Sequence, residues 1–250
     1  MRRIILAIAL LVFLISGGYL GNILWERYDA RQQNADIQKS VGVPLGADGT
    51  IGSYQPLSRE ALDKLKKQNP DFIAWITMPG TNINYPVVQG KTNNEYLHTT
   101  FDGKSRTAGT LFIDELNNAD FSDFNSIVYG HHMRDKTMFQ NLTLLREKKN
   151  FKRLRTVYVQ LYSGDVLKYE TSAVYLCHSD YDYRTIQYAT REETTDFCER
   201  ISEKSSFKPP TALTADDKIL TLSTCEYDYT DGRLAVHARL LSQTPLENWK

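Results

Sequence analysis

Cysteine is scarce in this chain: Cys177, Cys198 and Cys225 are the only three among 250 residues. So few thiols do not build a disulfide scaffold, and an odd number leaves at least one thiol unpaired within the chain. A bridge between Cys177 and Cys198 stays open, against the alternative that both are small buried apolar side chains. The composition therefore predicts a fold that is stabilised by its hydrophobic core rather than by disulfide bridges.

An excess of charge of either sign is also missing. The 30 lysines and arginines balance 30 acidic residues, which argues against a nucleic-acid binder, because such proteins usually carry a basic excess. Only 8 prolines occur, with no repeat or low-complexity tract, which excludes a fibrous or disordered chain. With 41% apolar residues, the composition indicates one globular domain of about 200 residues and a short appendage.

One long apolar run is present, at the amino end. Residues 4–24 hold no charged side chain, and the first acid after them is Glu26. As a helix this run reaches roughly 30 Å, the thickness of a bilayer core. Trp25 and Tyr28 follow where an interfacial aromatic belt lies. We therefore predict a membrane anchor that places the rest of the chain outside the cytoplasm.

A cleaved signal peptide is the alternative interpretation of this run. Residues 4–15 would then be its apolar region, and the small residues 16–18 would supply the cleavage site. We favour the uncleaved anchor because the apolar run continues through residues 19–24. We expect single-pass insertion at the cell membrane with an extracellular domain.

Three parts of the chain follow from these patterns. Residues 1–25 form the membrane anchor or signal peptide, and residues 26–54, polar and then rich in glycine, are predicted to be a stalk or linker. The globular domain occupies residues 55–250. Its first helix begins at Ser58, which can cap it, and ends before Pro70.

Short β-prone runs dominate the globular domain. They cover residues 72–78, 84–89, 110–113, 126–129, 156–162, 166–176, 218–224 and 234–241. One longer helix, residues 190–204, precedes the seventh run. About eight short strands at this spacing predict a mostly β fold, a closed β-barrel with attached helices.

Two of the predicted strands end at residues suited to covalent chemistry. Cys225 follows a strand-like run and precedes a polar segment, while His131 follows a β-prone run that ends at Gly130. Acyl transfer by cysteine needs a thiolate, a proton donor for the leaving amine and a group that stabilises the oxyanion. Cys225, His131 and Arg233 can fill these roles. A buried cysteine that closes a core strand is the structural alternative.

The two segments together resemble the sortase family. Residues 221–225, Thr-Leu-Ser-Thr-Cys, with Arg233 eight positions later, are similar to the sortase active-site signature. Residues 129–133, Tyr-Gly-His-His-Met, followed by Met-Phe at 138–139, resemble the class B form of the histidine segment. The helix at 190–204 resembles the class B insertion before the cysteine strand. The resemblance covers about residues 55–245 and implies a sortase-like barrel with an N-terminal helix.

Roles for individual residues follow from this resemblance. It implies Cys225 as the nucleophile, His131 as general acid and base, and Arg233 as the stabiliser of substrate and oxyanion. Ser223 and Thr224 are candidates for lining the substrate groove, although strand propensity alone explains both.

Several residues compete with this assignment. His132 neighbours His131, but adjacent residues of an extended segment point to opposite sides, so only one imidazole should face the nucleophile. Arg239 is a rival of Arg233, although an ion pair or surface position suits it better. The other histidines, His98, His178 and His237, lack a motif and are expected to be structural or at the surface.

The resemblance also implies the reaction and its partners. A class B sortase cleaves a C-terminal sorting motif of surface proteins after threonine, forms a thioacyl-enzyme at Cys225, and transfers the acyl group to a peptidoglycan amine. An Asn-Pro-x-Thr type of signal is expected, with no cofactor, no metal and no nucleic acid. A secreted cysteine protease, a pilin-polymerising sortase and a non-enzymatic surface binding module are the alternatives.

Overall fold

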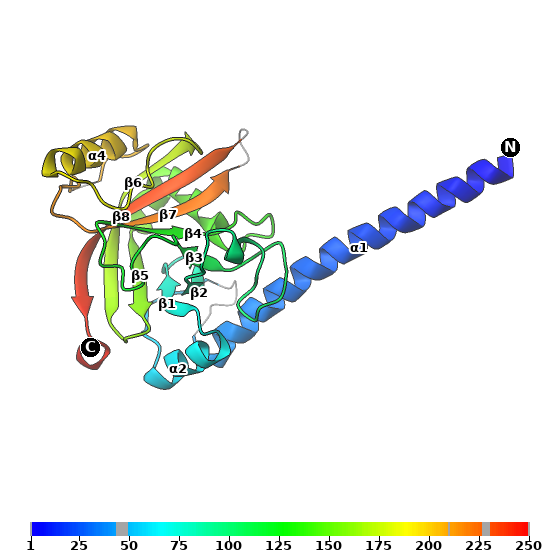
Figure 1. Cartoon of the computed structure of the whole chain (residues 1–250), viewed down its shortest axis with the longest axis horizontal. Helices are drawn as coiled ribbons and strands as arrows, with labels where there is room; N and C mark the ends of the chain where they lie inside the picture. The colour runs from blue at the N-terminus through cyan, green and yellow to red at the C-terminus, as the bar shows by residue number, and fades with distance from the viewer. Residues whose placement is uncertain (1, 44–49, 210, 227–230, 250) are drawn as a thin grey trace.

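Eight strands close into a barrel in the computed structural model, which describes residues 2–43, 50–209, 211–226 and 231–249 (Figure 1). The strands are β1 (Phe72–Thr77), β2 (Asn84–Val88), β3 (Leu111–Ile113), β4 (Asn125–Tyr129), β5 (Thr156–Leu161), β6 (Val166–His178), β7 (Ile219–Glu226) and β8 (Gly232–Thr244). All eight predicted strands are present, and the predicted mostly β barrel with attached helices is confirmed.

The order of strands around the barrel is β1-β2-β3-β4-β7-β8-β6-β5, and β5 pairs back onto β1. Two pairs are parallel, β2 with β3 and β4 with β7, and the other pairs are antiparallel. Because β4 and β7 run in the same direction, their carboxyl ends lie at the same rim of the barrel. The residues that follow those two ends are therefore brought together.

The barrel interior is filled by apolar side chains from every strand, as a small barrel requires. The helical turn η2 (Phe139–Arg146) adds three more to the same core, namely Phe139, Leu142 and Leu145. This turn follows the histidine segment, residues 129–138, directly. Packing of η2 in the core therefore holds the carboxyl end of that segment in place. Burying a large aromatic or aliphatic side chain contributes roughly 1.5–3 kcal/mol.

Two helices begin at side-chain caps, of which the sequence predicted the first, Ser58. Ser58 accepts a hydrogen bond from the backbone N–H of Ala61 at the start of α2 (Arg59–Gln68). Thr190 and Glu193 form a reciprocal capping box at the start of α4 (Arg191–Lys204). Helix α4 packs on β6 through a separate apolar cluster. The short helices α3 (Lys148–Arg153), η1 (Glu95–Leu97) and η3 (Leu246–Asn248) were not predicted.

The amino-terminal helix is longer than the sequence pattern indicated. Helix α1 (Arg2–Ser40) runs without a break through residues 26–40, where a stalk was predicted, and Figure 1 shows its first part extending away from the barrel. It is the one helix among the described residues that is long and apolar enough to cross a membrane. Its last turns pack on the barrel through Ala30 and Ile37, and Val41, directly after the helix, is buried as well. Apolar residues spaced by seven and four positions form too sparse a stripe to predict an amphipathic helix in a polar segment.

His237 on β8 is a histidine held neutral in the core. Its ring is fully buried between Tyr175 on β6 and Thr221 on β7, each 2.8 Å away. The Thr221 hydroxyl donates to Asn125, so it accepts from Nδ1–H of His237, and Nε2 accepts from the Tyr175 hydroxyl. Burial lowers the pKa of His237 to about 3.

Acid should therefore destabilise the fold through His237. The unfolded chain takes up this proton near pH 6.5 and the folded chain does not, so stability falls as the pH drops below 6.5, by up to about 1.4 kcal/mol per pH unit. Urea unfolding between pH 7 and pH 5 should show a shallower loss for His237→Gln than for the native chain. His178→Gln, which changes an exposed histidine, should keep the native slope. Equal slopes for all three chains would contradict the assignment.

Candidate active site

A cavity of about 300 Å³ opens at the barrel rim where β4, β7 and β8 meet. The sequence predicted five residues for the site, and four of them line this cavity: His131, Ser223, Thr224 and Arg233. The fifth, Cys225, is described in its backbone only, as part of β7, and its side chain lies outside the described residues. The other lining residues are Asn93, Asn94, Leu97, Phe112, Tyr129, Gly130, Tyr183 and Arg184.

Strand register accounts for this convergence. Tyr129 on β4 is paired with Ser223 on β7, and the N–H of Gly130 extends that ladder to the Ser223 carbonyl at 3.1 Å. His131 is the next residue. On the other side of β7, Cys225 is paired with Arg233 of β8. Three neighbouring chain segments thus carry the three predicted catalytic residues to one rim.

Gly130 is required by the close packing of this turn. A Cβ atom at this position would collide with the side chains of Leu111 and Phe139. Glycine therefore permits the backbone to pass between β3 and η2 before it reaches His131. The glycine in the histidine segment has a steric cause, which the sequence alone did not reveal.

The His131 imidazole is half-buried and held from two sides. Its Nε2 lies 2.6 Å from the carbonyl oxygen of Leu97, and its ring stacks on that of His98 with centroids 5.7 Å apart. A carbonyl only accepts hydrogen bonds, so Nε2 carries the proton and Nδ1 is left to exchange one. Burial lowers the pKa of His131, and the nearby His98 acts in the same direction, although the bond to Leu97 opposes them. At neutral pH the ring is therefore a base.

Arg233 brings a positive charge to the cavity. Its side chain is half-buried near the start of β8, and Nη1 donates to the Gly232 carbonyl at 2.9 Å. On the other edge of β8, which pairs with β6, the backbone of Arg233 is in register with that of Cys177. A guanidinium has five N–H donors, and among the described residues one bond, to Gly232, is present, so further donors are available to a ligand in the cavity.

Tyr183 is a lining residue that the sequence interpretation missed. Its hydroxyl lies 2.8 Å from the Ser223 hydroxyl, and both side chains are buried. Tyr183 and Arg184 come from the connection between β6 and α4, which the sequence treats as an ordinary loop. The only available signal was the repeated tyrosine at 181, 183 and 188. Leu97 and His98 were missed for the same reason, since no motif surrounds them.

The remaining cysteines behave as core residues. Cys177 and Cys198 are free, buried thiols in the cluster under α4. Burial raises the pKa of Cys177 to about 11 and that of Cys198 to about 12. A thiol that stays protonated at neutral pH is a poor nucleophile. Because both thiols are free, the alternative of a Cys177–Cys198 bridge is not realised.

The rival residues occupy other surroundings. Arg239 lies 3.5 Å from the Glu170 carboxylate, as expected for an ion pair. His132 pairs through its backbone with Met138 and, among the described residues, is outside the lining of the cavity. His178 is at the surface beside Asp180. His98 is exposed, as expected, and its ring also stacks on that of His131.

Comparison with known proteins identifies the family. The sortase domain model matches residues 76–241. Sortase B of Listeria monocytogenes is 30% identical over 236 residues, 93% of each chain. Sortase B of Bacillus anthracis has a TM-score of 0.75 at 33% identity, covering 88% of this chain and 100% of that one. A Staphylococcus aureus sortase B–substrate complex has a TM-score of 0.74 at 28% identity, covering 87% and 99%.

The sortase domain model covers more than half of this closed-barrel chain, and the chain belongs to the sortase family. Within the family it is a class B member, since both its curated relatives and its structural neighbours are sortase B proteins. Membership makes it a transpeptidase of the cell surface, associated with the membrane.

Proposed function

We propose that Cys225 is the nucleophile of this transpeptidase, with His131 as general acid and base and Arg233 as the stabilising cation. The observation that carries the proposal is the register at the rim. Cys225 is paired with Arg233 in the register of β7 and β8. It lies two residues beyond Ser223, whose carbonyl accepts a hydrogen bond from the N–H of Gly130, the residue before His131. This register supports the proposal because it brings the backbones of the three adjacent segments to one rim.

The reaction divides into two acyl transfers. In the first, the Cys225 sulfur bonds to the threonine carbonyl carbon of a sorting peptide while His131 takes the thiol proton. The peptide C–N bond then breaks, and His131 returns this proton to the leaving amine. In the second, an acceptor amine displaces the sulfur, its proton passes through His131, and the thiol is restored. Arg233 stabilises the oxyanion that forms in each half.

The protonation state of His131 supports this order of events. Its lowered pKa leaves the ring neutral at pH 7, ready to accept the thiol proton. The bond from Nε2 to Leu97 assigns the proton exchange to Nδ1. Burial thus gives His131 the protonation state that the first step requires.

The substrate is a sorting peptide of the Asn-Pro-x-Thr type carried by secreted surface proteins. The cavity holds polar groups for such a segment, including Ser223 and Thr224 of β7 and the amides of Asn93 and Asn94. The neighbouring sortase B structure from Staphylococcus aureus is described as a substrate complex. A peptidoglycan amine is the acceptor, which keeps both partners at the cell wall.

The topology that fits this role is a single pass with the barrel outside. The first part of α1 exposes an unbroken apolar surface that includes Leu10, Phe13 and Leu20. An exposed apolar surface of this length is stable in a bilayer. The barrel would then lie beside the membrane from which sorting substrates emerge.

Transfer to an amine is the test of this function. The full chain, supplied with a labelled Asn-Pro-x-Thr peptide and triglycine, should give a triglycine-ligated product, and mass spectrometry without amine should find the acyl group on Cys225. Cys198→Ala should keep this activity, because Cys198 is a buried core thiol, whereas Cys225→Ala should lose it. Release of the free acid alone, at any triglycine concentration, would make the enzyme a protease. Preference for a lysine side chain as acceptor would identify a pilin-polymerising enzyme.

A further inference from the structure

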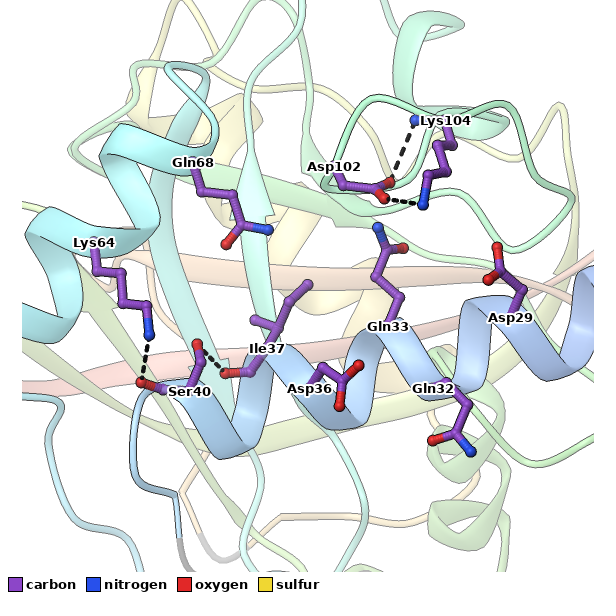
Figure 2. A pocket seen from close by; sticks show the side chains of 10 residues that line it. All are labelled: Asp29, Gln32, Gln33, Asp36, Ile37, Ser40, Lys64, Gln68, Asp102 and Lys104. Atoms are coloured by element: carbon purple, nitrogen blue, oxygen red, sulfur yellow. Dashed lines mark hydrogen bonds and ion pairs between the residues drawn. The ribbon is translucent and has the colours of Figure 1, made fainter.

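The last turns of α1 are fixed against the barrel by buried as well as exposed contacts. Ala30 and Ile37 are buried there, and the Gln38 amide donates to the Asn84 carbonyl of β2 at 2.7 Å. Figure 2 shows this part of α1 lying along the barrel, with Lys64 of α2 bonded to the Ser40 carbonyl at its end. This surface joins the predicted anchor to the catalytic domain.

An ion pair ties α1 to the segment that precedes β3. Arg106 donates from Nε and Nη2 to Asp29 Oδ2 at 3.1 and 2.9 Å. Side-chain exposures of 24% for Arg106 and 33% for Asp29 place the pair at the edge of the interface, where solvent screens it only in part. Two N–H groups on one carboxylate oxygen restrict the guanidinium more than a single contact would.

The same segment holds the His131 ring. The backbone N–H of Arg106 donates to the His98 carbonyl at 2.8 Å, and Thr99 and Ser105 form a β-bridge between them. His98 stacks on His131, and the carbonyl of the preceding Leu97 accepts from His131 Nε2. The contacts therefore run from α1 through Arg106 to both groups that fix the imidazole.

A second contact reaches the far end of the histidine segment. The Asn34 amide of α1 lies 3.9 Å from the Met138 sulfur, and Met138 is buried with a positive φ of 56°. The next residue, Phe139, donates its N–H to the His131 carbonyl at 3.0 Å. Helix α1 thus lies against the structures on both sides of His131.

We propose that α1 positions the catalytic histidine, with Asp29 and Arg106 as the positioning residues that hold the Leu97–His98 support against His131. The inference rests on the proposed role of His131 as acid and base. It makes the docked part of the anchor helix a component of the active site, although α1 itself contributes no lining residue to the described cavity.

The test compares Asp29→Asn and Arg106→Gln in the full chain, held in detergent micelles. A catalytic group displaced by a fraction of an ångström loses rate, so each variant should lower kcat on the order of tenfold, with KM changed by less than about twofold. Arg106→Lys keeps the charge but loses the pair of guanidinium hydrogen bonds to Asp29. Its kcat should therefore lie between those of the two variants and that of the native chain. Asp29→Arg combined with Arg106→Asp should recover most of the rate.

Imidazole ¹⁵N resonances of His131, recorded without substrate, separate positioning from general destabilisation. In both single variants the Nδ1–H tautomer should appear, and the pKa of His131 should move up toward 6.5, since a loosened ring is better hydrated. Arg191→Gln is the matched control, because it breaks an exposed ion pair with Asp216 at α4. It should leave both kcat and the resonances unchanged.

Unchanged kcat and unchanged His131 resonances in Asp29→Asn and Arg106→Gln would overturn the inference. A loss of rate that follows only a fall in melting temperature, with native resonances, would overturn it as well. If His131→Ala itself keeps full turnover, the proposed function fails instead. The resonances still report whether α1 holds the ring, so the two failures are distinguishable.

Discussion

Replacing His131 by alanine should lower kcat/KM for peptide cleavage by about 10²–10⁴-fold, the usual contribution of a positioned acid or base. The ring lines the cavity, and no other described histidine does, so none of them is placed to exchange the proton. A stopped assay with the labelled peptide, at saturating and limiting concentrations, measures the loss. The melting temperature should change little, because the ring is only half-buried.

His132→Ala is the control for this prediction and should stay within about twofold of the native rate, since surface substitutions away from a site have small effects. In the native chain, kcat/KM should fall as the pH drops through the pKa of His131, which burial holds below 6.5. The acid limb of the profile should therefore lie below pH 6.5. Loss of activity in His132→Ala with retention in His131→Ala would show that the wrong imidazole was chosen.

Replacing Arg233 by alanine should slow acylation by about 10²–10³-fold, the range found when one donor to an oxyanion is removed. Arg233 is paired with Cys225 across β7 and β8 and lines the cavity. We also expect its charge to lower the energy of a Cys225 thiolate, which an unperturbed cysteine of pKa about 8.5 forms only to a few per cent at neutral pH. Single-turnover measurement of thioacyl formation isolates this step.

Arg239→Ala serves as the control, since Arg239 lies on the same strand but pairs with Glu170. It should change the stability of the fold slightly and the acylation rate hardly at all. Arg233→Lys should recover part of the rate, because the charge returns without the planar donors. Near-native acylation by Arg233→Ala would remove the role assigned to this residue.

Much of the barrel could be predicted because its strands are short, β-prone and bounded by turn residues. The eighth strand shows both sides of this: the pattern over residues 234–241 predicted a half-buried strand, and β8 contains that range, but residues 234–238 are all buried because the cluster under α4 covers the second face. The eight-strand count, Ser58 as a cap and the helix before the cysteine strand are all present. Local propensity agreed with the fold in these elements.

What the sequence did not reveal depends on contacts between distant segments. The stacking of His98 on His131 joins residues 33 positions apart, and the bond between Tyr183 and Ser223 joins residues 40 apart. Neither pair leaves a periodic pattern. The helix over residues 26–40 was missed because its apolar stripe consists of Ala30 and Ile37 with polar residues between them. The roles of the catalytic residues came from the family resemblance and stay predictions.

The unbroken course of α1 has a mechanical consequence. Residues 22–40 of α1 contain neither proline nor glycine, the residues at which helices most often kink, and its last turns are fixed to the barrel. Membrane-spanning helices tilt by about 20° on average, and a rigid lever converts such a tilt into a sideways and vertical swing of its far end. The thickness of the surrounding lipid would then set the distance between the cavity and the bilayer surface.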